Sequence, residues 1–550
     1  MDKVVDIQSS RGMGWALRHF LLAGSGLMGG DKKNFEALLM ELQQAIQRGD
    51  TCISLGAPEQ ALLFRSRWFN GGQKQPLVIA GNKLYFYRYW HYENILAEKI
   101  LCYSAYKRDK ALLSRLLERY FPVADPDSTV QRDVLTKVLQ QSFSVISGGP
   151  GTGKTTLVVK LLAMEQELAN RSLKIALVAP TGKAAIRLQY AINENRIGLP
   201  CDEKIQSAIP QEVTTIHRLL GFRYGSSLFI HNKSNPLDYD LLVVDEASMI
   251  DLSLMTKLVT ALTAQTRVVL VGDKDQLSSV ETGSVLADLS ASTFVTTCEL
   301  LKTYRFNTQI KALAFLVNQQ RASEAWAMLM DPASEAVNGM ETEYMDFITH
   351  KYHCFFRAIA DKATVSQLFE KLADFVVLCT NKRGPKSVEA INQGVERRLR
   401  DNNIILQQEE WYLGRPVLIH ENDSVLGVFN GDVGICLPDP EQNNQLMVCF
   451  EQSNGGIKKI LPSRLPKSQT AFSLTVHKSQ GSQYREVMLV LPESYNPILT
   501  KEVVYTAVTR ARDKVWVVAD KEVLIQAIKV KISRQGGLRE KLRVNQFRSR

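Results

Sequence analysis

The feature that most constrains this chain is the glycine-rich run at residues 148–156, GGPGTGKTT, which fits the phosphate-binding pattern G-x-x-x-x-G-K-[ST]. An apolar run at 143–146 precedes it, and a helical pattern at 157–162 follows it. Glycines let the backbone N–H groups of such a loop point at phosphate oxygens, and the helix that follows adds its positive N-terminal end. The run therefore predicts a site for ATP or GTP between a strand and a helix of a parallel α/β sheet.

Individual residues in and before this loop have expected roles. Lys154 can reach the β- and γ-phosphates, and the Thr155 hydroxyl can ligate Mg²⁺. Gln131, on a helix ahead of the loop, can hydrogen-bond an adenine edge with both its donor and its acceptor. We expect ATP to be bound by Gln131, Gly148, Gly149, Pro150, Gly151, Thr152, Gly153, Lys154, Thr155 and Thr156.

Two carboxylates follow a second buried strand, predicted at 241–244. Asp245 is a candidate Mg²⁺ ligand, and Glu246 is a candidate base for the attacking water. Acidic side chains next to an apolar strand are costly unless they are used. Gln276 follows a further strand, at 268–271, where its amide can sense the γ-phosphate. The pattern indicates a site for nucleotide hydrolysis.

Length, charge and cysteine usage limit the class of protein. A chain of 550 residues exceeds one hydrophobic core and predicts three or four domains. The net charge of +10 favours an acidic partner, and Thr181 with Lys183, after an apolar strand at 175–179, suit a nucleic-acid backbone. Eight cysteines without paired spacing indicate a reducing compartment, and no apolar run is long enough for a membrane span. We expect a cytoplasmic protein without membrane contact.

Changes of pattern predict the domain organisation. We expect an N-terminal domain at 1–125, a first parallel-sheet domain at 126–330 and a second at 331–550. A short polar segment with strand-like ends predicts a β-hairpin insert at about 222–240. Short strands around hairpin signals such as Asn430-Gly431 predict a small β-barrel inserted at about 411–468.

Two segments leave alternatives open. Residues 84–92 are rich in aromatic and basic side chains, which is typical of a surface that stacks nucleic-acid bases. We favour a strand packed on the domain core or in a protein interface, because aromatic side chains mostly bury. The basic stretch at 529–550 is either a solvated tail or a contact for phosphate or an acidic partner.

The ordered motifs between Gln131 and Arg512 resemble those of superfamily 1 DNA helicases of the 5′-to-3′ branch. A closer resemblance is to the RecD helicases, the alpha subunits of exodeoxyribonuclease V. It is carried by residues 76–90, 215–221 (TIHRLLG), 245–249 (DEASM), 429–434 (FNGDVG) and 476–481 (VHKSQG). Gln483 departs from the pattern, because many relatives have glutamate there, which puts a ribose contact in doubt.

The resemblance implies an α/β fold with two RecA-like P-loop motor domains, a small SH3-like β-barrel insert and a separate N-terminal α+β domain. It implies Mg²⁺ ligation by Thr155 and Asp245, and two arginines, Arg305 and Arg510, supplied to the γ-phosphate by the second motor domain. The implied catalytic residues are Lys154, Asp245, Glu246, Gln276, Arg305 and Arg510. The implied DNA contacts are Thr181, Lys183, Thr215, His217, Thr475 and His477.

The implied activity is that of an ATP-dependent 5′-to-3′ helicase subunit, which unwinds duplex DNA ends for double-strand break repair and recombination. RecB-type and RecC-type subunits are the implied partners, docked by the N-terminal domain, and nuclease activity is expected only in the complex. A stand-alone RecD-like helicase remains the alternative, although the extra N-terminal sequence usual in that subgroup is not found. Only His19 and His91 precede the loop, which excludes a fused relaxase, and intact Lys154 and Glu246 argue against a non-catalytic subunit.

Overall fold

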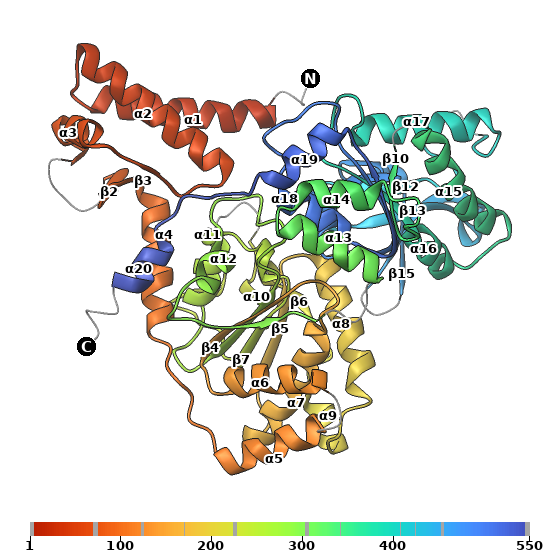
Figure 1. The fold of residues 1–550 in the computed structure, drawn as a ribbon, viewed down its shortest axis with the longest axis horizontal. Helices are drawn as coiled ribbons and strands as arrows, with labels where there is room; N and C mark the ends of the chain where they lie inside the picture. The colour runs from red at the N-terminus through yellow and green to blue at the C-terminus, as the bar shows by residue number, and fades with distance from the viewer. Residues whose placement is uncertain are drawn as a thin grey trace.

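The structure is a computed structural model that describes residues 5–69, 75–122, 126–169, 171–223, 228–302, 307–340, 343–406, 409–423, 425–452 and 456–544. Within these ranges the chain forms two parallel and two antiparallel sheets. The parallel sheets are the centres of two lobes, with the first N-terminal helices at one side (Figure 1). No helix in the described ranges is both long and apolar enough to cross a membrane.

The first α/β domain is built on a six-stranded sheet with the order β6-β5-β7-β8-β4-β9, in which every pairing is parallel. Successive strand residues face opposite sides, so that Val243 and Val244 belong to different hydrophobic clusters. This double burial explains the continuous apolar runs in the sequence. The strands are β4 (Phe143–Gly148), β5 (Ile175–Ala179), β6 (Thr214–Thr215), β7 (Leu241–Val244), β8 (Arg267–Gly272) and β9 (Thr296–Leu300).

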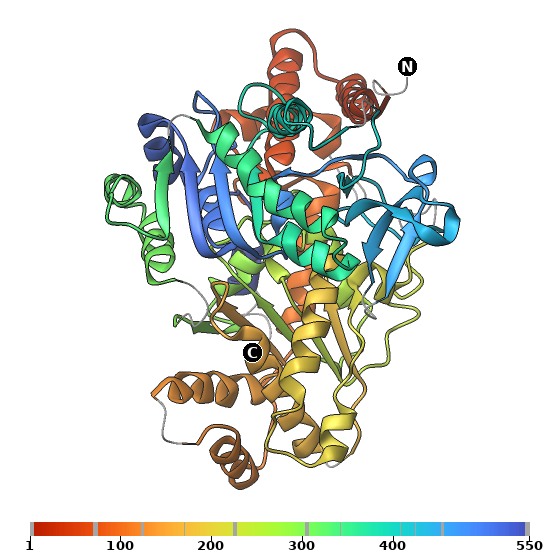
Figure 2. The ribbon, with the colours of Figure 1, turned by 90° about the vertical axis from the view of Figure 1, so that its right-hand side faces the viewer.

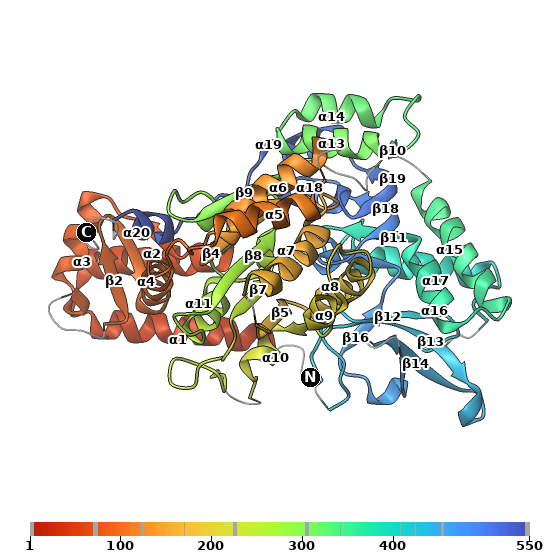
Figure 3. The ribbon, with the colours of Figure 1, turned by 90° about the horizontal axis from the view of Figure 1, so that it is seen from below.

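Helices cover both faces of this sheet, as Figure 3 shows for α7 and α11 on opposite sides of β7. One face is covered by α5 (Lys110–Tyr120), α6 (Pro126–Leu139), α7 (Lys154–Ala169), α8 (Gly182–Arg196) and α9 (Glu203–Ala208). The other is covered by α4 (Tyr87–Leu101), α10 (Ile216–Leu220), α11 (Leu252–Thr260), α12 (Val285–Ser290) and α20 (Leu538–Val544).

The second α/β domain has a five-stranded parallel sheet with the order β10-β19-β18-β11-β17. Its strands are β10 (Val337–Met340), β11 (Phe375–Cys379), β17 (Ser473–Thr475), β18 (Tyr484–Val490) and β19 (Ala511–Val518). One face packs on α13 (Thr308–Asn318), α14 (Ala322–Leu329), α18 (Lys501–Val508) and α19 (Lys521–Lys529). The other packs on α15 (Tyr344–Ala360), α16 (Val365–Ala373) and α17 (Val388–Asp401).

The antiparallel insert interrupts the second α/β domain where the sequence predicts short strands, and Figure 2 shows it projecting at one side. Its five strands have the order β15-β14-β13-β12-β16 and surround a small core that includes Val448 and Phe450. They are β12 (Pro416–Ile419), β13 (Val433–Asp439), β14 (Gln445–Glu451), β15 (Ile457–Ile460) and β16 (Ser468–Thr470).

The N-terminal module has its own hydrophobic core, formed between its helices and a three-stranded antiparallel sheet with the order β1-β3-β2. A turn at Gly81 joins β2 to β3, and Gly81 has a φ of +61°. The elements are α1 (Val5–Gly24), α2 (Gly29–Arg48), β1 (Cys52–Ser54), α3 (Ala57–Arg65), β2 (Leu77–Ala80) and β3 (Lys83–Phe86).

The hydrophobic cores extend across the domain boundaries that the sequence predicts near residues 125 and 331. Helices α4 and α5 precede residue 125, yet Leu96 and Leu117 lie in the two clusters of the first α/β domain. The N-terminal module therefore ends at Phe86. Likewise α13 and α14 precede residue 331 but pack in the core of the second α/β domain. The expectation of a strand through residues 84–92 is correct as far as Phe86 and wrong from Tyr87, where α4 begins.

The chain returns from the second α/β domain to the N-terminal module after α19, along residues 530–537, which we call the strap (Figure 1). The strap leads into α20, which packs beside α4, and Lys541 of α20 forms an ion pair with Glu93 of α4 (2.9 Å). The Thr51 N–H donates to the Gln535 carbonyl (2.8 Å). The described part of the basic stretch is thus bound within the molecule, which neither open alternative anticipated.

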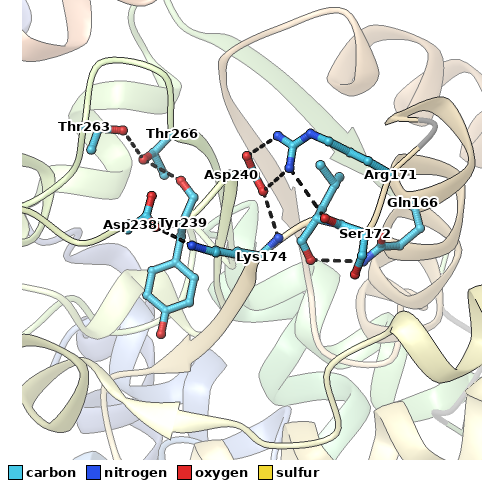
Figure 4. Close-up of polar contacts among 10 residues, drawn as sticks. Gln166, Arg171, Ser172, Lys174, Asp238, Tyr239, Asp240, Thr263 and Thr266 are labelled. Carbon is cyan, nitrogen blue, oxygen red and sulfur yellow. Dashed lines mark hydrogen bonds and ion pairs between the residues drawn. The ribbon is translucent and has the colours of Figure 1, made fainter.

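The segment predicted as a β-hairpin insert is irregular where the structure describes it. Residues 228–240 hold an isolated bridge between Asn232 and Asn235 instead of paired strands. The segment ends at Asp240, whose carboxylate accepts hydrogen bonds from Arg171 and from the Lys174 N–H (2.8 Å) (Figure 4). These contacts fix the start of β7 beside the start of β5, at the edge of the sheet away from the phosphate-binding loop.

Candidate functional site

The phosphate-binding loop joins β4 to α7, as the sequence predicts. Gly151 and Gly153 have φ values of +77° and +81°, which side chains with a Cβ rarely adopt, and this accounts for both glycines. The ammonium of Lys154 donates to the carbonyl oxygens of Gly148 (2.6 Å) and Gly149 (2.9 Å). Burial lowers the pKa of Lys154, and the nearby carboxylates, Asp273 first among them, oppose that shift. The loop therefore presents a half-buried cation at the start of a helix.

The two predicted carboxylates lie beside this cation. Asp245 and Glu246 follow β7 and line one pocket together with Lys154 and Thr155. Burial, and then the negative charge of Glu246, raise the pKa of Asp245 to about 6. Glu246 has a φ of +50°, a left-handed conformation that is costly for a residue with a side chain and is concentrated at functional sites. A strained backbone thus places two acidic groups opposite the lysine.

The Thr155 hydroxyl and the Asp245 carboxylate form a donor set that fits Mg²⁺, a cation that binds oxygen ligands and shares them with phosphates and water. Within the described ranges no group of three or more His, Cys, Asp or Glu side chains is arranged so that it could hold a metal ion. An Mg²⁺ ion bound here would therefore take its remaining ligands from a nucleotide and water.

Gln276 also lines the pocket, and a second domain approaches it there. The Gln276 amide donates to Asp273 Oδ2 (2.9 Å), and the Tyr505 hydroxyl of α18 donates to the same oxygen (3.3 Å). Burial raises the pKa of Asp273, and Lys154 opposes this shift. The second α/β domain thus contacts a carboxylate of the first beside the phosphate-binding loop.

Arg510, just after α18, is fully buried with 1% of its surface exposed. Its Nε donates to the Thr506 carbonyl (3.1 Å), and its Nη1 donates to the Ser482 carbonyl (3.2 Å). Nη2 has no hydrogen-bond partner among the described residues. Burial lowers the pKa of Arg510, and the charge of Glu246 opposes this most. A guanidinium of the second domain therefore lies in the field of the Glu246 carboxylate of the first, with donor capacity unused.

Of the predicted ATP-binding residues, Gly148, Gly149 and Thr152 of the loop are not among those that line the pocket. Three further predicted nucleotide-site residues are placed elsewhere or not described. Gln131 lies in α6 and is not among the residues that line the pocket. The Thr156 hydroxyl is directed to α8, where it donates to Asn195 Oδ1 (3.2 Å). Arg305 lies outside the described residues.

A second cavity, of about 280 Å³, lies between the two α/β domains and the antiparallel insert. Three of the predicted DNA-contact residues line it, namely Thr181 and Lys183 from the first domain and His477 from the second. Burial lowers the pKa of His477, which favours the neutral ring. We call this cavity the groove; its other lining residues are Met249, Asp251, Ser279, Val280, Glu281, Asn430, Gly431, Lys478 and Gln480.

The other predicted DNA-contact residues do not line the groove. The Thr215 hydroxyl accepts a hydrogen bond from the Arg218 N–H (3.2 Å) and caps α10, and the His217 ring packs edge-on against Phe229 at 5.7 Å. Thr475 is buried at the end of β17. Thr181 both lines the groove and caps a helix. Its hydroxyl accepts a hydrogen bond from the Ala184 N–H (3.2 Å) at the start of α8.

Sequence reasoning missed several residues at the two sites. Arg187 of α8 lines the nucleotide pocket, 3.9 Å from the Glu246 carboxylate, and Asp273 with Tyr505 joins the domains there. Asp273 follows β8 as Asp245 follows β7, so its position at a strand end was an available signal. Arg187 and Tyr505 lie within helices and carry no such signal.

Two family models match the chain. Residues 131–282 match an AAA domain, and residues 470–518 match a UvrD-like helicase C-terminal domain. The first match contains the phosphate-binding loop with Asp245, Glu246 and Gln276, and the second ends in β19, just after Arg510. The nucleotide pocket is therefore lined by the part of the chain that matches an ATPase domain, and Tyr505, in the part that matches a helicase domain, contacts Asp273 beside it.

Curated relatives extend this result over most of the chain. The RecBCD enzyme subunit RecD of Haemophilus influenzae is 32% identical over 539 residues, which cover 85% of this chain and 81% of that relative. The same subunit of Mycolicibacterium smegmatis is 37% identical, covering 86% and 84%. The ATP-dependent RecD2 DNA helicase of Deinococcus radiodurans is 31% identical over 70% of this chain but only 48% of its own length. The chain belongs to the RecD family, and it is an ATP-dependent helicase of superfamily 1.

Proposed function

We propose that this chain hydrolyses ATP between its two α/β domains, as RecA-like motor domains, and uses the energy to move 5′-to-3′ along one strand of DNA. The observation that supports this most is Arg510, a buried guanidinium of the second domain with an unused donor, held in the field of Glu246. An arginine brought to the phosphates by a second domain makes hydrolysis depend on closure of the two domains.

The residues of the pocket divide the chemistry. Lys154 supplies positive charge to the phosphates, Glu246 positions and deprotonates the attacking water, and Gln276 senses the terminal phosphate from its place beside Asp273. Thr155 and Asp245 would hold Mg²⁺, which neutralises phosphate charge when bound. Arg510 stabilises the charge that develops in the transition state, and Arg305 is proposed for the same task.

The groove is the proposed path of the single strand. Thr181 and Lys183 approach it from the first domain and His477 from the second. Because these residues lie on different domains, opening and closing of the two domains would move the DNA contacts of one domain relative to those of the other along the strand. Thr215, His217 and Thr475 are proposed to shape this path, since they hold the ends of neighbouring elements. The antiparallel insert, proposed to be an SH3-like barrel, closes one side of the groove with Asn430 and Gly431.

The proposed assembly is a heterotrimer with RecB-type and RecC-type subunits, acting on duplex DNA ends in double-strand break repair and recombination. The support is that the two RecD relatives described above are named as subunits of a RecBCD enzyme and are covered over most of their length. The N-terminal module is the proposed docking domain.

Unwinding assays test the polarity. Partial duplexes with a 5′ or a 3′ single-stranded tail are offered to the chain with ATP and Mg²⁺, and Glu246→Gln provides the inactive control. We expect separation of the 5′-tailed substrate alone. Preference for a 3′ tail would refute the polarity, and full activity with no association to RecB-type and RecC-type proteins on co-purification would favour a stand-alone helicase.

A further inference from the structure

The segment at residues 279–283, which we call the wall, lines one side of the groove with its first three residues and binds Arg534, a side chain from the strap. Arg534 Nη2 donates to the carbonyl of Ser279 (2.6 Å), and Nη1 donates to the carbonyls of Glu281 and Gly283 (3.0 Å each). The segment contains neither helix nor strand. The Ser279 hydroxyl also donates to the Glu281 (3.0 Å) and Gly283 (3.4 Å) carbonyls, and the guanidinium joins all three carbonyls to the strap.

The N-terminal module encloses this guanidinium. Gly49, which ends α2, has a φ of +93°, and a Cβ at that position would lie 2.6 Å from Arg534 Cζ. The Gly49 carbonyl also accepts a hydrogen bond from the Gly283 N–H (2.9 Å). Burial lowers the pKa of Arg534, and Asp50 opposes that shift. Arg534 is therefore packed in a fitted site between the module and the wall.

The wall held in this way presents an apolar side chain to the groove. Ser279, Val280 and Glu281 line the cavity, and 73% of the Val280 surface is exposed. Arg534 is not among the lining residues. An exposed aliphatic side chain beside Lys183 and Lys478 suits the sugar or base of a strand whose phosphates the lysines attract.

The same strap is fixed to the second α/β domain a few residues earlier. The Ile532 N–H donates to the carboxylate of Glu502 (3.1 Å), and the Val530 carbonyl accepts from the Lys501 N–H (2.8 Å), both at the start of α18. Two extended residues span about 7 Å at most. While these contacts hold, the wall cannot move far from α18.

We propose that Arg534 is a positioning residue for single-stranded DNA, which acts through residues 279–283 by fixing Val280 in the groove and does not itself touch the strand. This rests on the proposed function, in which the groove holds the strand.

Binding of an oligothymidylate and DNA-stimulated ATPase activity, measured on the full chain, test this role. Arg534→Ala removes the hydrogen bonds, Arg534→Lys keeps the charge and part of the donor capacity, and Lys531→Ala removes an exposed charge from the same strap. We expect Arg534→Ala to raise both the Kd and the DNA concentration for half-maximal ATPase about tenfold. The kcat at saturating DNA should stay within about twofold, Arg534→Lys should recover part of the affinity, and Lys531→Ala should resemble the unaltered chain.

The salt dependence of the Kd separates positioning from direct contact. A residue that only positions the wall leaves the slope of log Kd against log salt unchanged, whereas loss of a phosphate contact reduces its magnitude by about 1. Val280→Ala should weaken binding in the same way, and the double variant should be less than additive. A reduced slope, unchanged affinity in Arg534→Ala, or additive effects would each overturn the proposal. If the unaltered chain neither binds the oligothymidylate nor shows DNA-stimulated ATPase activity, both the proposed function and this role of Arg534 are wrong.

Discussion

The hydroxyl of Thr506 accepts a hydrogen bond from the backbone N–H of Leu277 (2.9 Å), which joins α18 of the second α/β domain to the loop after β8 of the first. Both groups are buried, and Gln480 adds a second contact by donating to the Leu277 carbonyl (2.7 Å). Gln276, which lines the nucleotide pocket, is the residue next to Leu277. The contact between the domains and the nucleotide site therefore involve adjacent residues of the same loop.

Replacing Thr506 by valine should therefore weaken domain closure. The change keeps the side-chain shape but leaves the Leu277 N–H without its acceptor, at a cost of about 1–3 kcal/mol to the closed state. We expect kcat for DNA-stimulated hydrolysis to fall about tenfold or more while nucleotide affinity changes little. Thr506→Ser, which keeps the hydroxyl, is the control and should retain most activity. A parallel loss of nucleotide binding would indicate general misfolding.

Replacing Lys154 or Glu246 by glutamine should abolish hydrolysis and unwinding without loss of the fold. Each substitution removes a charge that stabilises the transition state, and single interactions of this kind are worth about 10²–10³ in kcat. Turnover is to be measured beside circular dichroism and thermal melting. Near-normal DNA-stimulated turnover in either variant would contradict the assigned roles.

Arg510→Ala should keep nucleotide binding and lose most of the rate. Arginines supplied across a domain boundary contribute about 10³–10⁵ in other nucleotide hydrolases. Because the Arg510 side chain is fully buried, its removal also leaves a cavity, so Arg510→Lys is needed beside it. A nucleotide titration and a turnover assay distinguish the roles, since equal losses in both would make Arg510 structural.

Truncation should separate the N-terminal module from the motor. A variant that begins at Tyr87 keeps α4 and α5 in the core of the first α/β domain, and it should retain DNA-stimulated ATPase activity. It should fail to co-purify with RecB-type and RecC-type proteins if the module is the docking domain. A variant that begins at Pro126 lacks both helices and should not fold. Retained ATPase activity in that second variant would contradict the core boundary at Phe86.

Asp288 should make stability depend on pH. It lies on α12, facing Glu93 of α4, Arg539 of α20 and Lys83 of β3, and burial, then Glu93, raise its pKa from 3.8 to about 7. Between these values the unfolded chain is ionised and the folded chain holds a proton, so stability falls as the pH rises from about 4 to about 7. Asp288→Asn should shift the urea midpoint upward at pH 8 relative to the unaltered chain. The exposed Asp401→Asn serves as control, and equal shifts in both would exclude the buried site.

The sequence predicted those parts of the site that follow from short continuous segments. Lys154, Asp245, Glu246 and Gln276 each follow a strand closely, and the carboxyl ends of parallel strands meet at one edge, so they converge on one pocket. Tyr505 reaches Asp273 from α18 across more than two hundred residues, and no local pattern encodes that approach.

Tertiary contacts determine the structure of the two segments for which the sequence-based expectations differ from the structure, the aromatic run and the strap. The aromatic run after Phe86 has strand propensity, but Tyr89 and Tyr92 pack on the cluster around α11, and the chain forms a helix. The basic stretch at 529–550 left two interpretations open, a solvated tail or a contact for phosphate or an acidic partner, because charge alone does not identify a partner. Binding of the strap depends on Gly49 and on carbonyls of residues 279–283, which have no sequence signature.

The strap gives the two α/β domains a second mechanical connection. The chain first passes between them after Leu300 and before Thr308, and it comes back to the first domain between Ile532 and Arg534. A rigid body held at one point can tilt in any direction, but one held at two points can only rotate about the line that joins them. In the proposed cycle of opening and closing, the two crossings therefore restrict the directions in which one α/β domain can move against the other.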